Sequence, residues 1–176
     1  MKTFVLGLIF LGFTNLLHAQ NDLAYVKVDI DEPVMSSNNY LVNSKYYDAF
    51  DNKIASGHVR EFQKVVAKYD IKRSDIYSSN SNSNYTVVFE EGENKIQAEY
   101  DQDGRIVKCT ELFKDIRLPY AISSDISKQY PGWAFDAVEC NITYDNNNNQ
   151  QVIYKVEIQK GNKKKSLKVN TSDYNL

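Results

Sequence analysis

The sequence predicts an α+β domain in which two units, each a helix followed by an antiparallel meander, share one sheet with both helices packed on one face. Two stretches with apolar residues at three- and four-residue spacing are each followed by segments in which apolar and polar residues alternate. Turns that contain glycine separate the alternating segments. Because apolar faces of helices and sheets must be buried against another element, we expect one compact domain built of helix and sheet layers.

The N-terminus predicts a secretory signal peptide over residues 1–19. Lys2 precedes an apolar run from Phe4 to Leu17, and Ala19 supplies the small residue that signal peptidase requires. The run is too short to favour a membrane span, and no later segment is continuously apolar, so we expect no membrane insertion after cleavage. No cysteine follows the run to carry a lipid anchor. We therefore expect a periplasmic or secreted protein of a Gram-negative bacterium.

A polar lead-in over residues 20–53 precedes the first unit, which covers residues 54–117. Within the lead-in, the alternation from Ala24 to Ile30 predicts an edge strand. The first helix is predicted over about Ile54 to Tyr69, with Ser56 as its N-cap. The strands expected after this helix cover residues 74–79, 85–90, 95–101 and 105–113.

The second unit covers residues 118–176. Its helix is predicted to begin near Pro119, which suits a first-turn position, and to end at Pro131-Gly132. The apolar face of this helix carries Ile122, Ile126 and Tyr130. The strands expected after it cover residues 133–144, 152–159 and 164–170.

The two units also indicate an internal repeat. At an offset of 69 residues the apolar phase and the turn glycines coincide, which independent alternation would seldom produce. The matched pairs are Tyr85 with Tyr154, Val87 with Val156, Phe89 with Ile158, Gly92 with Gly161, Ala98 with Leu167, and Tyr100 with Val169.

The second unit resembles the PepSY-like exported bacterial proteins. The residues that carry this resemblance are a Leu118-Pro119 helix start, a Tyr130-Pro131-Gly132 stop, the strand Tyr154–Ile158 and the Gly161 turn. These proteins are similar in fold to the β-lactamase inhibitor protein. The resemblance covers about residues 54–176, and the first copy departs from it, with Tyr69-Asp70-Ile71 in place of the Tyr-Pro-Gly stop. It implies an inhibitory or regulatory binding module.

The sequence offers little material for catalysis, cofactors or metals. One histidine, His58, remains after signal removal, at the start of the predicted first helix. The segment Asp101 to Gly104 begins like a calcium loop, but Arg105 occupies the next ligand position and no glutamate closes the loop, so a hairpin turn is favoured. Every glycine is isolated, which argues against a phosphate-binding loop. We expect no enzyme, no cofactor and no metal site.

Charge and cysteine content limit the partners and the chemistry further. The formal net charge is −2, and the basic run at residues 163–165 is interpreted as decoration of a hairpin turn, so we expect no nucleic-acid partner. Cys109 and Cys140 could form a disulfide in an exported protein if their Cα atoms lie within about 7 Å. They could equally be two separate buried thiols.

Three aromatic residues are the candidate partner-binding site. If Val138 and Cys140 point to the helix-covered face, strict alternation places Trp133 and Phe135 on the open face, where Tyr77 of the first unit would join them. Tryptophan and tyrosine are enriched at interface hot spots. Alternatively, a β-bulge returns Trp133 and Phe135 to the core.

These observations lead to one expected function and one alternative. We expect an exported, non-enzymatic binding protein that engages a protein partner, not identified by the sequence, through an open β-sheet face. The alternative is a protein that binds a small ligand or a cell-envelope glycan in a groove beside the helices, which predicts a pocket lined by aromatic residues.

Overall fold

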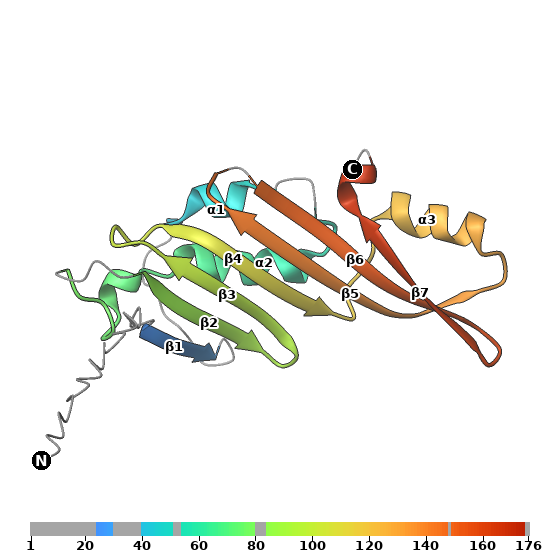
Figure 1. The fold of residues 1–176 in the computed structure, drawn as a ribbon, viewed down its shortest axis with the longest axis horizontal. Coiled ribbons are helices and arrows are strands. Elements are labelled where there is room, and N and C mark those ends of the chain that lie inside the picture. The colour runs from blue at the N-terminus through green and yellow to red at the C-terminus, as the bar shows by residue number, and fades with distance from the viewer. Residues whose placement is uncertain (1–23, 30–39, 51–53, 80–83, 148, 175–176) are drawn as a thin grey trace, which may run out of the picture.

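The computed structural model describes residues 24–29, 40–50, 54–79, 84–147 and 149–174. In this part of the chain seven strands form one mixed sheet whose order in space follows the order in sequence (Figure 1). Helices α1 and α2 lie behind one half of the sheet, and α3 lies at its other end beside β7 (Figure 1). The predicted α+β class is therefore confirmed. The predicted signal peptide lies outside the described residues.

The elements follow one another in a simple order. The strands are β1 (Ala24–Asp29), β2 (Tyr85–Glu91), β3 (Asn94–Tyr100), β4 (Ile106–Lys114), β5 (Ala134–Asp145), β6 (Asn149–Lys160) and β7 (Lys163–Asn170). The helices are α1 (Ser44–Asp48), α2 (Gly57–Lys68) and α3 (Tyr120–Gln129), with short 3-10 turns η1 (Ile71–Arg73) and η2 (Thr171–Asp173). Strand β1 pairs parallel to β2, and every other neighbouring pair is antiparallel. No helix of the described residues is long and apolar enough to cross a bilayer.

The ladder register defines two faces of the sheet. One row across five strands consists of Phe89, Ile96, Glu111, Ile142 and Val152, all of them buried. This is the helix-side face, because Phe62 of α2 packs edge-on against Phe113 at 5.6 Å and Tyr69 against Phe89 at 5.2 Å. Residues on the opposite, open face are mostly polar, and Lys108, Thr110 and Thr143 among them are exposed. Such one-sided burial is what period-two alternation in an antiparallel sheet predicts.

Both predicted helices form, and most of their apolar stripes are buried; Tyr69 and Tyr130, which follow the last helical residues, are half-buried. Val59 and Val66 of α2 and Ile122 of α3 are fully buried in a single cluster. Ser56 precedes α2 in an extended conformation, as an N-cap does, but its side chain makes no capping hydrogen bond. The hairpin turns are also confirmed, since Gly92 and Gly161 adopt φ values of 56° and 57°, where a side chain would be strained.

One local prediction is wrong, and one helix was not predicted. Residues 74–79 form turns rather than a strand, because the amide of Lys72 donates to the Asp70 side chain and the amide of Tyr77 to the Ser74 carbonyl. Such local hydrogen bonds compete with a strand ladder. The lead-in also contains α1, a helix too short to produce a periodic apolar pattern. Its Tyr46 and the following Phe50 are buried in the core.

Candidate partner-binding site

A β-bulge decides where the candidate aromatic residues lie. In the β5–β6 ladder Phe135 pairs with Ile158 and Ala137 with Glu157, so Asp136 is an extra, unpaired residue. Directly opposed residues share a face, and Ile158 belongs to the buried helix-side face. Phe135 therefore points to the helix side, and the prediction that it faces the open side is wrong. Trp133 precedes β5, and its ring packs against the core. The bulge of the alternative prediction is present, but it returns Phe135 to the helix-side face without burying it in the core.

The bulge does not bury the aromatic residues completely. Phe135 is 41% exposed although it lies on the helix-side face. Trp133 is partly buried against the core, with its ring edge-on to Tyr130 at 6.2 Å. Helix α3 ends at Gln129, so no described helix residue continues over this part of the sheet. We call Tyr130, Trp133 and Phe135 the aromatic end.

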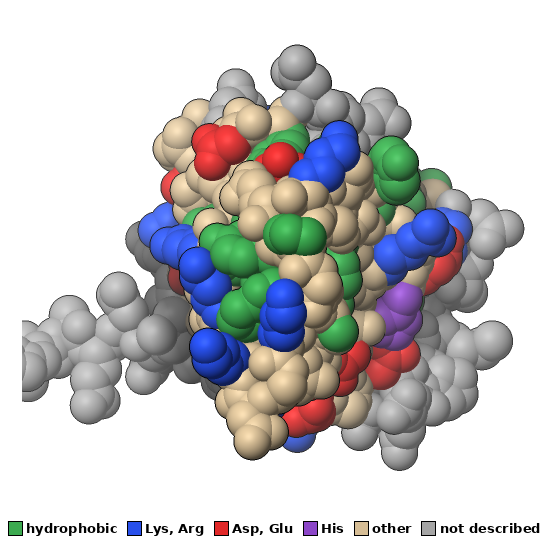
Figure 2. Space-filling model, turned by 90° about the vertical axis from the view of Figure 1, so that its right-hand side faces the viewer, with side chains coloured by type: hydrophobic (Ala, Val, Ile, Leu, Met, Phe, Trp, Pro, Cys, Tyr) green, Lys and Arg blue, Asp and Glu red, His purple; other side chains and the backbone are tan. Residues whose placement is uncertain are grey.

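Lysine side chains border the aromatic end. The ammonium of Lys165 lies 4.5 Å from the centre of the Tyr130 ring, and that of Lys160 donates to the Pro131 carbonyl at 3.3 Å. Lys164 donates to Asp136 in the bulge at 2.7 Å, and this hydrogen bond raises the pKa of Lys164. Figure 2 looks onto this end of the molecule and shows hydrophobic side chains with Lys and Arg side chains beside them. Apolar contact area and positive charge are therefore presented together.

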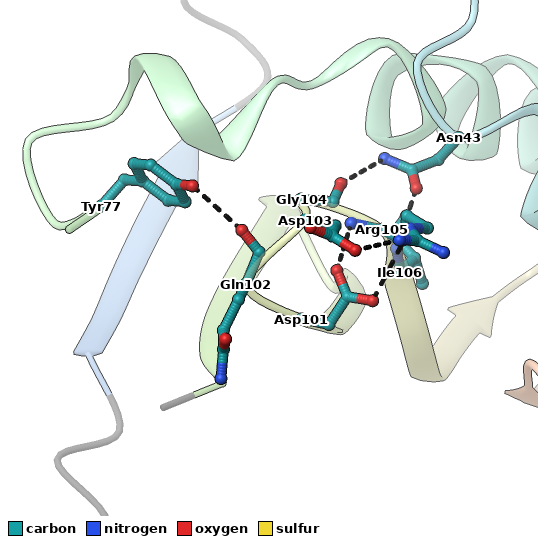
Figure 3. Close-up of polar contacts among 8 residues, drawn as sticks. All are labelled: Asn43, Tyr77, Asp101, Gln102, Asp103, Gly104, Arg105 and Ile106. Atoms are coloured by element: carbon teal, nitrogen blue, oxygen red, sulfur yellow. Dashed lines mark hydrogen bonds and ion pairs between the residues drawn. The ribbon is translucent and has the colours of Figure 1, made fainter. Parts of the chain in front are cut away.

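Tyr77 does not belong to the aromatic end. Its ring packs on Tyr85 at 5.4 Å, and its hydroxyl donates to the Gln102 carbonyl at 2.9 Å (Figure 3). Tyr85 pairs with Tyr100 at the end of β3, and the ladder continues from there toward Asp145 of β5, the end of β5 opposite to Phe135. The predicted three-residue patch is therefore split between the two ends of the sheet.

A groove between α3 and β7 lies next to the aromatic end. It encloses about 560 Å³ and is lined by Asp125, Gln129, Tyr130, Leu167, Val169 and Tyr174, among others. The Tyr174 hydroxyl and the Gln129 side-chain amide both donate to one Asp125 oxygen, at 2.8 and 2.9 Å. The hydrogen bond from Tyr174 to Asp125 raises the pKa of Tyr174. An aromatic-lined groove beside the helices is what the alternative function predicts, but its lining residues could not be named from the sequence, because a groove between two elements depends on how they pack.

A buried carboxyl group that was not predicted from the sequence lies beneath α1 and α2. Glu111 is 4% exposed; one of its oxygens accepts from the Tyr46 hydroxyl at 2.7 Å and the other from the Gln63 amide at 2.9 Å. Burial raises the pKa of Glu111 to about 7, although both hydrogen bonds and the positive charge of Arg60 oppose this shift. One clue was available: Glu111 falls between Cys109 and Phe113 in the inward phase of β4.

The side chains of the remaining polar motifs form local hydrogen bonds and ion pairs. In the Asp101–Gly104 turn, Asp101 accepts from the Arg105 amide at 2.8 Å and Asp103 forms an ion pair with the Arg105 side chain (Figure 3). The predicted hairpin turn is thus confirmed. His58 lies beside Glu91 at 3.0 Å, with its side chain about half exposed. Within the described residues no group of three His, Cys, Asp or Glu side chains could hold a metal ion.

Hydrogen bonds of the Asn43 side chain connect the lead-in to the Asp101–Gly104 turn. Its side-chain oxygen accepts from the Ile106 amide at 2.8 Å, and its amide group donates to the Gly104 carbonyl at 3.3 Å (Figure 3). The Asn43 backbone amide donates to the Ala67 carbonyl at the end of α2. One buried asparagine therefore joins three elements.

The two cysteines are separate buried thiols, so the possible disulfide is not formed. Cys109 pairs with Tyr144, whereas Cys140 pairs with Phe113, four residues further along β4. At about 3.3 Å per strand residue the offset is roughly 13 Å, beyond the reach of a disulfide. Burial raises the pKa of both thiols, that of Cys140 to about 12.

The fold and the site define a class of architecture, a mixed seven-stranded sheet with helices on one face and an exposed aromatic end. Comparison with protein-family models, with curated proteins and with solved structures finds no match for the chain.

Proposed function

We propose that this chain is an exported, non-enzymatic binding protein that engages a protein partner through the aromatic end of its sheet. The observation that carries the proposal is Phe135, which lies on the helix-side face of the sheet yet is 41% exposed. Trp133 and Tyr130 beside it are residue types enriched at binding hot spots. Export rests on the predicted signal peptide, and an inhibitory or regulatory role rests on the resemblance to PepSY-like proteins.

A binding role fits the chemistry of the molecule better than turnover does. A carboxyl group with a strongly raised pKa is often a sign of an active site. Here that group is Glu111, which is buried beneath two helices with both oxygens already accepting hydrogen bonds. A substrate would have to displace Tyr46 or Gln63 to reach it. The exposed aromatic surface, in contrast, is available without rearrangement.

Affinity capture from the native cell envelope tests this proposal. The wild-type protein, Trp133→Ala and Phe135→Ala serve as baits, with Tyr120→Ala as a matched control. Tyr120 is an aromatic residue that is 85% exposed, but it lies at the start of α3, whereas Trp133 follows its end. We expect one protein to be captured by the wild type and by Tyr120→Ala, and to be lost with both variants of the aromatic end.

One outcome would contradict the proposal, and one would shift the test to the second variant. Equal capture by all four baits would show that the partner binds elsewhere on the surface. If Trp133→Ala unfolds, Trp133 serves packing; Phe135→Ala then decides, because an exposed ring contributes little to folding. Thermal melts of every bait separate loss of binding from loss of structure.

The α3–β7 groove supports a second candidate function, the binding of a small ligand or a cell-envelope glycan. Tyr130 and Tyr174 line it, as an aromatic-lined pocket beside a helix requires, and its volume of about 560 Å³ is within the range of ligand sites. This function predicts that no bait captures a protein. It also predicts that soluble glycan fragments raise the melting temperature of the wild type but not of Gln129→Ala.

A further inference from the structure

We propose that β7 accepts an acidic, extended segment of the partner as an eighth, antiparallel strand, with alternate side chains entering the groove beside α3. This inference rests on the proposed function and describes how the partner binds. Addition of a strand to an exposed sheet edge is a recurrent mode of peptide recognition.

The outer edge of β7, with which no strand in the described part of the chain pairs, is the first observation that carries the proposal. Strand β7 is eight residues long and ends the sheet. The two-residue turn at Gly161 closes on the pair Lys160–Lys163, so hydrogen bonds to β6 fall on Lys163 and every second residue after it. The intervening residues Lys164, Ser166 and Lys168 therefore direct their backbone N–H and C=O groups away from β6.

The groove is the second observation. Leu167 and Val169 lie on the helix-side face of β7 because they pair with the buried Val156 and Tyr154. Both remain only half-buried and line the groove with Ile126 of α3. A strand placed next to β7 would direct every second side chain to this same face. Apolar side chains at those positions would complete the burial of Leu167 and Val169.

The charge of β7 indicates which kind of segment can pair with its outer edge. Strand β7 has the sequence KKKSLKVN and carries no acidic residue. Antiparallel pairing of β7 with a second copy of itself would oppose lysines across the new ladder, which is destabilising. Within the described residues, Lys163 and Lys168 form no ion pair. A segment with glutamate or aspartate opposite Lys168 would place a carboxylate where a second copy of β7 would place a lysine. Lys164 already donates to Asp136, so Lys168 carries most of this attraction, and the complementary partner is acidic.

The register specifies the sequence pattern that should bind. In an antiparallel ladder, peptide residues that hydrogen-bond to Lys164, Ser166 and Lys168 share the open face with them, and the alternate residues face the groove. We therefore choose an acetylated and amidated peptide of four Glu-Val repeats as the probe, with four Lys-Val repeats as its control. Trp133, the single tryptophan of the chain, contacts the Tyr130 ring that lines the groove, so its fluorescence reports binding.

Backbone variants test the edge itself. Ser166→Pro removes an outward N–H and leaves the hydrogen bonds to β6 in place. An edge strand tolerates proline at such a position. We expect at least a tenfold weaker Kd for the Glu-Val peptide with Ser166→Pro and an unchanged Kd with the control Ser166→Ala. We also expect at least tenfold weakening by Lys168→Glu. The same charge change at exposed Lys108 on β4 should alter Kd by less than twofold.

Methylated peptides test the pairing on the unaltered protein, so they decide even if Ser166→Pro fails to fold. N-methylation of the glutamates should abolish binding, and N-methylation of the valines should not. Any other pattern overturns antiparallel addition. The proposal that the added strand is acidic is contradicted if the wild type does not bind the Glu-Val peptide, or if it binds the Lys-Val peptide with equal affinity. If a captured partner is lost by Trp133→Ala but kept by Ser166→Pro, the proposed function stands and this inference fails.

Discussion

Strands β3 and β7 occupy matched positions in the sequence but end in different environments. Ala98 and Tyr100 of β3 are fully buried, whereas Leu167 and Val169, 69 residues later, are half-buried. Strand β3 lies between two neighbours and beneath Tyr69, whose ring is 6.1 Å from that of Tyr100. Among the described strands, β7 has a neighbour on one side only, and it faces a groove. The same alternating pattern therefore yields core in one place and accessible surface in the other, and the neighbours decide which.

The largest effect that this comparison predicts is a difference between Tyr100→Ala and Val169→Ala. Removing the fully buried Tyr100 ring leaves a cavity and should cost about 3–5 kcal/mol of folding free energy. Removing two methyl groups from half-buried Val169 should cost about 1 kcal/mol or less. Urea unfolding measures both.

Tyr100→Phe is the control for the first substitution. The Tyr100 hydroxyl has no hydrogen-bond partner among the described residues, so its removal should leave stability unchanged or slightly raised. Equal losses for Tyr100→Ala and Val169→Ala would contradict the difference in burial between the two strands.

The half of the sheet beneath α1 and α2 contains the buried Glu111, so folding stability should depend on pH through this residue. Burial raises the pKa of Glu111 from 4.5 to about 7, so the folded state holds this proton over a range where the unfolded chain has lost it. The stabilisation is fully present below pH 4.5 and is lost as pH rises through 7. Its total is on the order of 3 kcal/mol.

The measurement is the difference in unfolding free energy between the wild type and Glu111→Gln at several values from pH 4 to pH 9. Glutamine cannot titrate, so other groups cancel in the difference. We expect the wild type to lose stability relative to Glu111→Gln as pH rises. Parallel profiles would show that Glu111 titrates alike in the folded and unfolded states.

A smaller effect is expected from Asn43, which joins the lead-in to the β3–β4 turn. Asn43→Ala leaves the amide of the buried Ile106 without its acceptor and should cost about 1–3 kcal/mol. The control is Asn141→Ala on the open face, where the side chain is exposed and, within the described ranges, donates a hydrogen bond to Glu139 alone. That change should stay within about 0.5 kcal/mol. Comparable losses would mean that the turn is held by other contacts.

The smallest effect should come from reducing agent. A disulfide would typically contribute about 2–4 kcal/mol, and its reduction would lower the melting temperature. Because Cys109 and Cys140 are out of register by four residues, we expect the same melting temperature with and without reductant. Thiol labelling should report two free groups only after unfolding. A fall in melting temperature on reduction would contradict the β4–β5 register.

Elements governed by local periodicity were predictable from the sequence. The stripe of Val59, Phe62 and Val66 identifies α2, and Gly161 fixes the β6–β7 turn, because each depends on residues close together in the chain. Helix α1 was not predictable in this way, since five residues make little more than one helical turn. Its place is set by distant contacts such as that between Tyr46 and Glu111.

The candidate site shows where sequence reasoning fails. Trp133 and Phe135 were found by their type, but the face of Phe135 was reversed by one unpaired residue, Asp136. Residues 133–137 contain no glycine, which would have indicated a bulge in the sequence. Tyr77 was placed on a strand that does not form, so its grouping with the other two failed for a separate reason. Glu111 was visible as an acidic residue in an apolar phase.

Asp136 has a consequence for how this surface could change over generations. Because Phe135 and Ala137 already pair with the adjacent residues Ile158 and Glu157, in-frame loss of the codon for Asp136 would convert the bulge into a regular ladder and keep both pairs. Phe135 would stay on its side of the sheet, but Lys164 would lose the carboxylate to which it donates. One in-frame deletion would thus make the aromatic end more positive without moving the Phe135 ring.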